Sequence, residues 1–382
     1  MQVPASAPSP TKQAFVGTLN YMPQLDGLRG LAVLGVLVEH YLPGEILYKT
    51  LHSVYSGVSR FETVINNKLF IGHLGVRLFF VLSGFLITRN LLVDREALAL
   101  NCSPYWPSIK KFYRRRLRRL MPVYYLVLLV TALLAFQSIK PALLFYFTYT
   151  SNIYFSFHDW DTTASHLWSL AVEEQFYLCW PWIILLAPER RLLGAMQLLL
   201  GSAFLFRGLC FLFGWSNGSM EYSMTIACLD NLCAGSLLAL LRKKHLLADN
   251  QSLSRWFWLS FVAFACIHLV DFTRHPVLVV SENLVNSIFF ALLINQAADG
   301  FGGISKTILE HPWLRYIGKI SYGIYVYHYF VVPYTLFKII SFAGLSSLPA
   351  LIVTGLKFAL SILVASLSWH LLEKQFQVRK VL

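Results

Sequence analysis

A histidine and an arginine share an apolar stretch near the start of the sequence. Arg29 and His40 are eleven residues apart, about three turns of an α-helix, so a helix would carry both on one face, about 16 Å apart along its axis. A histidine there can deprotonate a hydroxyl, because its ordinary pKa of about 6.5 is close to neutral pH. Glu39 would point about 100° away, so we do not expect it to orient the histidine. The spacing predicts a general base, His40, and a cation on the same face, Arg29.

Further polar residues lie inside apolar stretches, where an ionised group costs about 2.5–3.5 kcal/mol and usually has a functional or pairing reason. Arg77 and Ser83 lie in one such stretch. His166 and Glu173 lie in another, seven residues apart and therefore on one helix face, and Glu174 follows. Two adjacent carboxylates cannot both face lipid. We expect Arg29, Arg77 or Ser83 to stabilise an oxyanion, and Glu173 or Glu174 to line the same polar cavity.

Two pairs of residues are candidate substrate contacts. His166 and Trp168 open one apolar stretch, and Tyr325 and His328 are near neighbours on one helix face within another. Tyrosines inside a stretch, rather than at its ends, indicate a polar lining. No pair of histidines or carboxylates has the spacing of a zinc site, so we expect no metal. The sequence has no Gly-x-Ser-x-Gly elbow, which argues against a serine hydrolase.

A run of basic residues precedes the third apolar stretch. It holds five arginines in six positions, Arg114–Arg116, Arg118 and Arg119. Binding to lipid headgroups explains such runs in general, but guanidinium groups at this density suit bidentate binding of phosphate. We therefore expect a phosphorylated donor from the cytoplasm, held by Arg115, Arg116 and Arg119. Most of the net charge of +13 follows from membrane topology, so we do not expect a nucleic-acid partner.

Composition indicates the elements that must position these residues. Of the 382 residues, 56% are apolar and only 13% are charged, whereas a soluble domain carries about 25% charged residues. Apolar segments of about 20 residues, the length that crosses the hydrocarbon of a bilayer, recur along the chain. They predict an all-α, polytopic bundle of about ten helices, near 26–46, 73–93, 121–138, 166–187, 192–213, 225–241, 256–272, 278–298, 318–340 and 348–372. The segment 139–158 is short enough to be re-entrant or interfacial, which would leave the count at ten.

Basic residues are distributed unevenly between the loops. With both termini inside, 22 of the 32 lysines and arginines fall on the cytoplasmic side, as expected for an inner-membrane protein. The first twenty residues lack the pattern of a signal peptide. We therefore expect a disordered cytoplasmic tail at 1–20, one membrane domain at 21–373 and a cytoplasmic tail at 374–382.

The order of these motifs resembles the membrane acyltransferase-3 family. The first helix of that family carries an Arg or Lys separated by ten residues from a His, as Arg29 and His40 are here. The other resembling segments follow in the family's order: 75–85, the Arg-x-x-Arg run that ends at Pro122, 166–177, and 321–328. The resemblance covers nearly the whole chain. Many relatives append an esterase-like domain outside the membrane, and we expect a form without it, since the sequence stops ten residues past the last predicted span.

The resemblance implies a bundle that takes an acyl group from cytoplasmic acyl-CoA, as acetyl-CoA or a longer thioester, and delivers it to a hydroxyl on the far side. The acceptor is commonly a sugar of the cell envelope, such as lipopolysaccharide O-antigen. Carried over by position, His40 is the base with Arg29 as its partner, Arg116 and Arg119 hold the phosphates of coenzyme A, and Glu173 or Glu174 lines the pore.

Other interpretations stay open at this point. The acceptor could be a small secondary metabolite such as a macrolide, and transfer could pass through an acyl-enzyme. A transporter would also place charged residues in a bundle, although the sequence has no visible inverted repeat. A sensor or scaffold would need only packing and the basic run. Acceptor identity and oligomeric state are not determined by these patterns.

Overall fold

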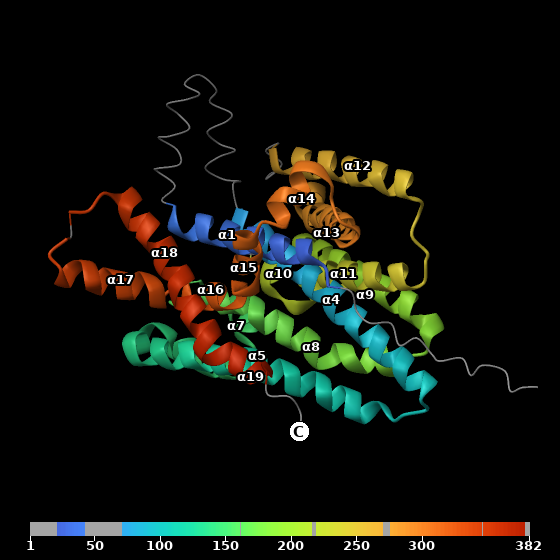
Figure 1. Ribbon diagram of the computed structural model, residues 1–382, viewed down its shortest axis with the longest axis horizontal. Helices are drawn as coiled ribbons and strands as arrows, with labels where there is room; N and C mark the ends of the chain where they lie inside the picture. The colour runs from blue at the N-terminus through green and yellow to red at the C-terminus, as the bar shows by residue number, and fades with distance from the viewer. Residues whose placement is uncertain are drawn as a thin grey trace, which may run out of the picture.

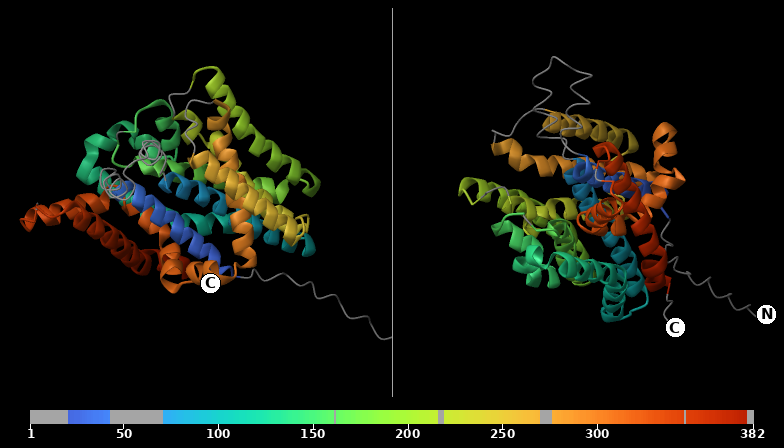
Figure 2. Two further views of the ribbon diagram at one scale, coloured as in Figure 1. Left: turned by 90° about the horizontal axis from the view of Figure 1, so that it is seen from above. Right: turned by 90° about the vertical axis from the view of Figure 1, so that its left-hand side faces the viewer.

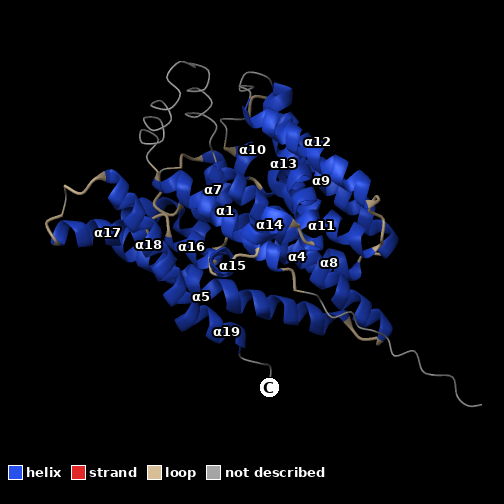
Figure 3. Cartoon of the chain, turned by 45° about the horizontal axis from the view of Figure 1, so that its top comes forward, coloured by secondary structure: helices blue, strands red, loops and turns tan. Residues whose placement is uncertain are grey.

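The structure of the protein is a computed structural model that describes residues 21–42, 71–160, 162–215, 219–269, 276–345 and 347–378. Within these ranges every regular element is a helix, which confirms the all-α prediction (Figure 3). The predicted tail at 1–20 and the last four residues of the predicted tail at 374–382 lie outside the described residues.

The helices have the following bounds in chain order: α1 (Pro23–Tyr41), α4 (Ile71–Leu100), α5 (Tyr105–Ile139), η1 (Lys140–Ala142), α6 (Leu143–Phe147), α7 (Ser151–Phe157), η2 (Ser165–Leu167), α8 (Trp168–Leu186), α9 (Glu189–Leu212), α10 (Met220–Ser223), η3 (Thr225–Cys228), α11 (Leu229–Lys243), α12 (Asn250–Leu269), α13 (Pro276–Asp299), α14 (Gly303–Leu309), α15 (Pro312–Lys319), α16 (Ser321–Tyr327), α17 (Val331–Phe342), α18 (Ala350–Ser368), the π-helical turn η4 (Trp369–Glu373) and α19 (Lys374–Val378).

Several helices are long and apolar enough to cross a membrane. Among the described residues five segments meet this condition, and the pair Val280–Asp299 and Gly303–Leu309, bent by 90°, makes a sixth if it is counted as one span. The five are Gly72–Leu100, Tyr105–Phe147, Glu189–Leu212, Thr225–Lys243 and Ala350–Phe376. The protein is therefore a multi-pass membrane protein, but the predicted count of ten spans is not confirmed.

Two physical reasons explain why some of the predicted spans are not among these membrane-length helices. The helix α1 carries Asp26, Arg29 and Glu39 within its 19 residues, too many charges for an apolar span. The predicted span 318–340 is divided among α15, α16 and α17, each too short to cross alone at about 1.5 Å per residue. The segment 139–158 is likewise divided into η1, α6 and α7.

The site is built around a central helix, α4, which packs against α1, α8 and α11 (Figure 1). The crossing with α11 is close because both helices have glycine there. A Cβ on Gly84 would lie 1.9 Å from the Leu232 carbonyl oxygen, and a Cβ on Gly235 would lie 1.9 Å from that of Val81. Small residues let helices approach in this way where no hydrophobic effect drives their association.

The helix α5 runs along one side of the bundle, and α17 and α18 project from it (Figure 1, Figure 2). The basic run, predicted to precede a span that begins at 121, lies inside α5, which begins at Tyr105. Because the arginines are helical, their side chains have a fixed three- and four-residue periodicity. Only one face of the run can therefore point into the bundle.

A buried ion pair joins α9 to α11. The Arg207 guanidinium donates to Asp230 Oδ2 over 2.6 Å, and side-chain exposure is 2% and 0%. A charge buried without a partner is expensive, so each residue requires the other. This pair accounts for a polar residue, Arg207, that lies inside a predicted span.

Candidate functional site

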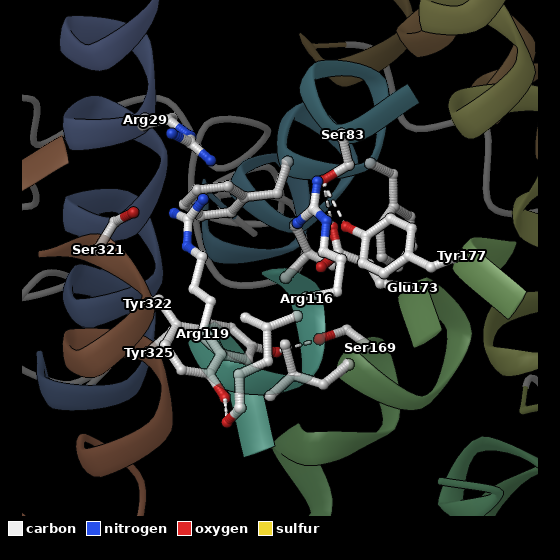
Figure 4. Close-up of a pocket in the computed structure, with 15 residues that line it drawn as sticks. Arg29, Ser83, Arg116, Arg119, Ser169, Glu173, Tyr177, Ser321, Tyr322 and Tyr325 are labelled. Carbon is white, nitrogen blue, oxygen red and sulfur yellow. Dashed lines mark hydrogen bonds between the residues drawn. The ribbon is translucent and has the colours of Figure 1, made fainter. Parts of the chain in front are cut away.

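The bundle holds two adjoining cavities. The first, called here the arginine cavity, has a volume of about 70 Å³ and is formed by α1, α4, α5, α8 and α16 (Figure 4). Its lining consists of Arg29, Val76, Phe79, Phe80, Ser83, Arg116, Arg119, Leu120, Ser169, Leu170, Glu173, Tyr177, Ser321, Tyr322 and Tyr325. The second, the histidine cavity, has a volume of about 180 Å³. It is lined by Val36, Glu39, His40, Gly72, His73, Val76, Trp160, Ser165, His166, Trp168, Tyr222, Tyr325 and Tyr329.

Three guanidinium groups converge on the arginine cavity, one from α1 and two from α5 (Figure 4). Arg116 and Arg119 are three residues apart and therefore share a helix face. Arg116 lies 4.5 Å from the centre of the Tyr177 ring, and Arg119 has a buried Nε atom without a hydrogen-bond partner. Arg29 is 3.8 Å from the nearest oxygen of Asp26, too far for a strong pair. Among the described residues the Nε–H of Arg119 thus has no partner and is free for a ligand.

Arg115, also expected to bind phosphate, is exposed and does not line the arginine cavity. It is adjacent to Arg116 and so points about 100° away on α5.

A chain of hydrogen bonds fixes the carboxylate of the arginine cavity. Ser83 Oγ donates to Glu173 Oε1 over 2.6 Å, and the Tyr177 hydroxyl donates to Ser83 Oγ over 3.1 Å (Figure 4). Glu173 thus lines the cavity beside Arg116 and across from Arg29 and Arg119. Glu174 lies outside both cavity linings, and its Oε1 atom is buried without a partner. Of the two expected carboxylates, Glu173 is the one the fold brings to the cavity.

The histidine cavity is lined by His40 of α1, His73 of α4 and His166 of η2, and His328 at the end of α16 contacts His40 and His166 from outside the lining. His40 Nδ1 lies 2.9 Å from His328 Nε2, and the two rings stack with centroids 4.9 Å apart. His328 is fully buried, and its Nδ1 donates to the Tyr325 carbonyl over 2.6 Å at the end of α16. His166 Nε2 lies 3.3 Å from the Val326 carbonyl, while its Nδ1 is buried without a partner.

The two cavities share two wall residues, Val76 and Tyr325. The Tyr325 hydroxyl donates to the His166 carbonyl over 2.8 Å and lies 2.6 Å from Ser169 Oγ. Tyr325 was expected to contact substrate, and it stands between the arginines and the histidines. Trp168 lines the histidine cavity and is 4% exposed.

Arg77, expected to stabilise an oxyanion, lines neither cavity. It is fully buried between helices. Its Nη1 donates to Cys228 Sγ, its Nη2 donates to the Tyr222 carbonyl, and its guanidinium lies 4.9 Å from the centre of the Tyr222 ring. In this position Arg77 connects α4 to α10 and η3.

Sequence reasoning missed several residues of the histidine cavity. The Tyr329 ring stacks on His166 with centroids 4.9 Å apart and meets His40 edge-on. Glu39 Oε2 accepts hydrogen bonds from the Gly72 and His73 amides in the first turn of α4, where a helix leaves its N–H groups unpaired. The sequence signal that could have indicated Tyr329 is the cluster of tyrosines around His328. The sequence does not show which of these tyrosines lines the cavity.

The sequence that forms the two cavities matches a known protein family. The family described as "Acyltransferase domain", acyltransferase family 3, matches residues 22–370. The chain belongs to the membrane acyltransferase-3 family. The match includes both cavities, from Arg29 on α1 to Tyr329 after α16. No three or more His, Cys, Asp or Glu residues of the described ranges gather as a metal site.

Relatives of this acyltransferase-3 protein are named as O-acetyltransferases. It is 28% identical over 349 residues to "Peptidoglycan O-acetyltransferase OatA" of Listeria monocytogenes, with 82% of this chain and 50% of the relative covered. It is 27% identical over 387 residues to "Putative peptidoglycan O-acetyltransferase YrhL" of Bacillus subtilis, with 94% and 55% covered. A "Putative O-acetyltransferase" of Staphylococcus aureus is 28% identical over 385 residues, with 94% and 58% covered. The chain thus spans about half the length of these relatives. No solved structure matches it.

Proposed function

We propose that this protein transfers an acetyl group from cytoplasmic acetyl-CoA to a hydroxyl of a cell-envelope glycan across the inner membrane, with His40 as the general base. One observation carries the proposal: the arginine cavity and the histidine cavity adjoin at Val76 and Tyr325. A cationic compartment for the donor thus meets a basic compartment for the acceptor.

The arginine cavity supplies what an acyl-CoA needs. Arg116 and Arg119 present N–H donors from one face of α5, and such donors suit the phosphates of coenzyme A. The phosphates bind toward the cytoplasmic end of α5, and the flexible pantetheine arm carries the thioester toward Tyr325. Arg29 faces the same compartment and stabilises negative charge on the donor.

The histidine cavity supplies the acceptor chemistry. His40 takes the proton of the acceptor hydroxyl as its oxygen attacks the thioester carbonyl, forming a tetrahedral intermediate. The intermediate collapses by breaking the carbon–sulfur bond, and His40 returns the proton to the coenzyme A thiolate. The products are an ester and the free thiol, so atoms and charges balance. The buried, unpartnered Nδ1 of His166 accepts a hydrogen bond from a second hydroxyl of the acceptor.

The acceptor proposed here is a sugar rather than a macrolide. Two bare imidazole nitrogens, one for the reacting hydroxyl and one for a second, suit a molecule with neighbouring hydroxyls, as sugars have. The relatives named for peptidoglycan support this class. Lipopolysaccharide O-antigen belongs to the same class, and the experiment below separates the two.

The test uses the purified protein in lipid nanodiscs with acetyl-labelled acetyl-CoA and separate peptidoglycan, O-antigen and macrolide acceptors, with the label located by mass spectrometry. The expected product carries the label as an ester on a glycan.

His40→Ala should lower transfer by at least about 100-fold, the usual contribution of a general base, at unchanged Tm. Arg116→Ala with Arg119→Ala should raise the KM for acetyl-CoA by at least about tenfold, since charged hydrogen bonds contribute about 1.5–3 kcal/mol each. Arg115→Ala, on the exposed side of α5, is the matched control.

Full transfer by His40→Ala would reject its role as base. An unchanged KM in the double arginine variant would reject the phosphate site. Movement of a solute without consumption of acetyl-CoA would make the protein a transporter and overturn the proposal.

A further inference from the structure

We propose that His328 is a positioning residue that fixes the tautomer of His40, so that Nε2 of His40 is the basic nitrogen. The proposal rests on the proposed function of His40 as base. It gives His328 a role different from the substrate contact that the sequence suggested, because its ring is fully buried and lies outside both cavity linings.

The first step concerns the proton on His328. Its Nδ1 lies 2.6 Å from the Tyr325 carbonyl oxygen. A carbonyl oxygen only accepts hydrogen bonds, so Nδ1 must carry a hydrogen and donate it. Because this carbonyl belongs to the last turn of α16, where helix carbonyls lack backbone donors, the bond also caps the helix and holds the ring in place.

The second step concerns the charge on His328. Within the part of the chain that the structure describes, the rings around it belong to Tyr41, His40, His166, Tyr325 and Tyr329, and none of these groups is a carboxylate. A cationic imidazole there would be a fully buried charge without a counterion, which is costly. His328 is therefore neutral, and with its hydrogen on Nδ1 its Nε2 is a bare acceptor.

The protonation of His328 fixes which nitrogen of His40 carries the hydrogen. Its Nδ1 lies 2.9 Å from the bare Nε2 of His328, so Nδ1 of His40 must be the donor. A neutral His40 then has its lone pair on Nε2. His40 lines the histidine cavity and has only this second ring nitrogen left for the acceptor hydroxyl.

This arrangement orients a base as the third member of a catalytic triad does, through a bond to the far nitrogen of the imidazole. Here the orienting group is a neutral imidazole that is itself held by a backbone carbonyl. When His40 gains the proton of the acceptor, its Nδ1–H donates from a charged ring and the bond to His328 strengthens. The stabilisation appears in the transition state, so its loss lowers kcat.

Two substitutions of equal polarity separate orientation from packing. In His328→Gln the amide oxygen can occupy the place of Nε2 and accept from His40. In His328→Asn the amide can occupy only the place of Nδ1, which keeps the bond to Tyr325 but loses the one to His40. We expect His328→Asn to lower kcat by about 10–100-fold, as loss of an orienting partner does, and to leave the KM for acetyl-CoA within about twofold. His328→Gln should keep kcat within about fivefold of the wild type.

A second measurement does not depend on turnover. Nitrogen NMR of protein labelled with ¹⁵N-histidine in nanodiscs distinguishes protonated from bare ring nitrogens, and a His40→Gln variant identifies the His40 signals. The expected result at neutral pH is a protonated Nδ1 and a bare Nε2 on His40, with the preference lost in His328→Asn. The opposite tautomer, or equal kcat in the Asn and Gln variants, would overturn the proposal. If His40→Ala is active while the tautomer is as expected, the function fails and the assignment of the hydrogen stands.

Discussion

The side chains of the two cavities leave different kinds of hydrogen-bonding atoms free. The arginine cavity offers N–H donors from Arg29, Arg116 and Arg119, which suit an anion. The histidine cavity offers imidazole lone pairs from His40 and His166, which suit a molecule that donates. In the proposed function, the residues therefore separate the two substrates by the direction of the hydrogen bonds that they make.

A substitution of His166 tests whether the histidine cavity binds the hydroxyl acceptor. Its Nε2 faces the Val326 carbonyl, so its buried Nδ1 is bare and requires a donor. His166→Phe keeps the stacking on Tyr329 but removes the lone pair, and we expect the KM for the glycan to rise by about 3–10-fold, since one neutral hydrogen bond contributes about 0.5–1.5 kcal/mol. Steady-state kinetics with the glycan varied at saturating acetyl-CoA provide the measurement. Trp160→Phe, which keeps an aromatic ring in the same cavity, is the control, and an unchanged KM in His166→Phe would show that Nδ1 does not bind the acceptor.

For single residues, the sequence indicated which side chains line the cavities better than it indicated which of them contact each other. The spacing of Arg29 and His40 followed from helix geometry, and both line the adjoining cavities. The contact of His40 with His328 joins residues 288 positions apart, so no local pattern could indicate it. Arg77 looked functional because it is charged inside an apolar stretch, but a charge there can equally hold helices together, as its bonds to Cys228 and Tyr222 do.

The helices that carry the site residues pack closely against their neighbours, backbone against backbone, at glycines. The α4–α11 crossing depends on Gly84 and Gly235, and the α1–α15 crossing on Gly318, whose Cβ would lie 1.8 Å from the Asp26 carbonyl oxygen. Contacts this short leave no room for a methyl group. These glycines thus set how closely α4, which carries Ser83, packs on α11, and how closely α1, which carries Arg29 and His40, packs on α15.

We expect Gly84→Ala to destabilise the protein by about 1–3 kcal/mol, the usual cost of overpacking, because the two backbones must move apart. Thermal unfolding of the detergent-purified protein measures it as a lower Tm. Gly201→Ala in α9 is the matched control, because a Cβ there meets nothing within 4 Å and alanine is the better helix former. Equal Tm values for the two variants would contradict the close crossing.

Apolar periodicity predicted the existence of most helices but not their lengths or their number across the membrane. The helix α4 runs to Leu100 and α5 starts at Tyr105, so most of the predicted loop between 94 and 120 is helical. Charged residues continue a helix beyond the bilayer at no cost, and hydropathy alone cannot detect this. Hydropathy also favours one span at 318–340, where the structure has two breaks, one between α15 and α16 and one between α16 and α17.

For the whole molecule, we expect the space left in the arginine cavity beside Tyr325, beyond the arginines that would hold the phosphates, to limit the acyl group. The cavity has a volume of about 70 Å³, room for a few waters, so an acetyl group should fit it more easily than a chain of eight carbons. We expect kcat/KM for acetyl-CoA to exceed that for octanoyl-CoA by at least about tenfold, which corresponds to about 1.4 kcal/mol of overpacking.

Leu170→Ala enlarges this cavity and should reduce the preference. Leu178→Ala, on the exposed side of the same helix, should leave it unchanged. Competition between the two thioesters in one reaction measures the ratio, and a preference for octanoyl-CoA in the wild type would contradict the limit.

The wall that Tyr325 forms between the cavities has a consequence for the energetics of the cell. A bundle that receives one substrate from each side of a membrane would, with a continuous water-filled passage, let protons run down their gradient. Tyr325 is held by the His166 carbonyl and Ser169 at the point where the two cavities adjoin. In the proposed function, we expect its ring to restrict water between the two cavities while the site waits for its substrates, so that a membrane with many copies of the protein still holds its proton-motive force.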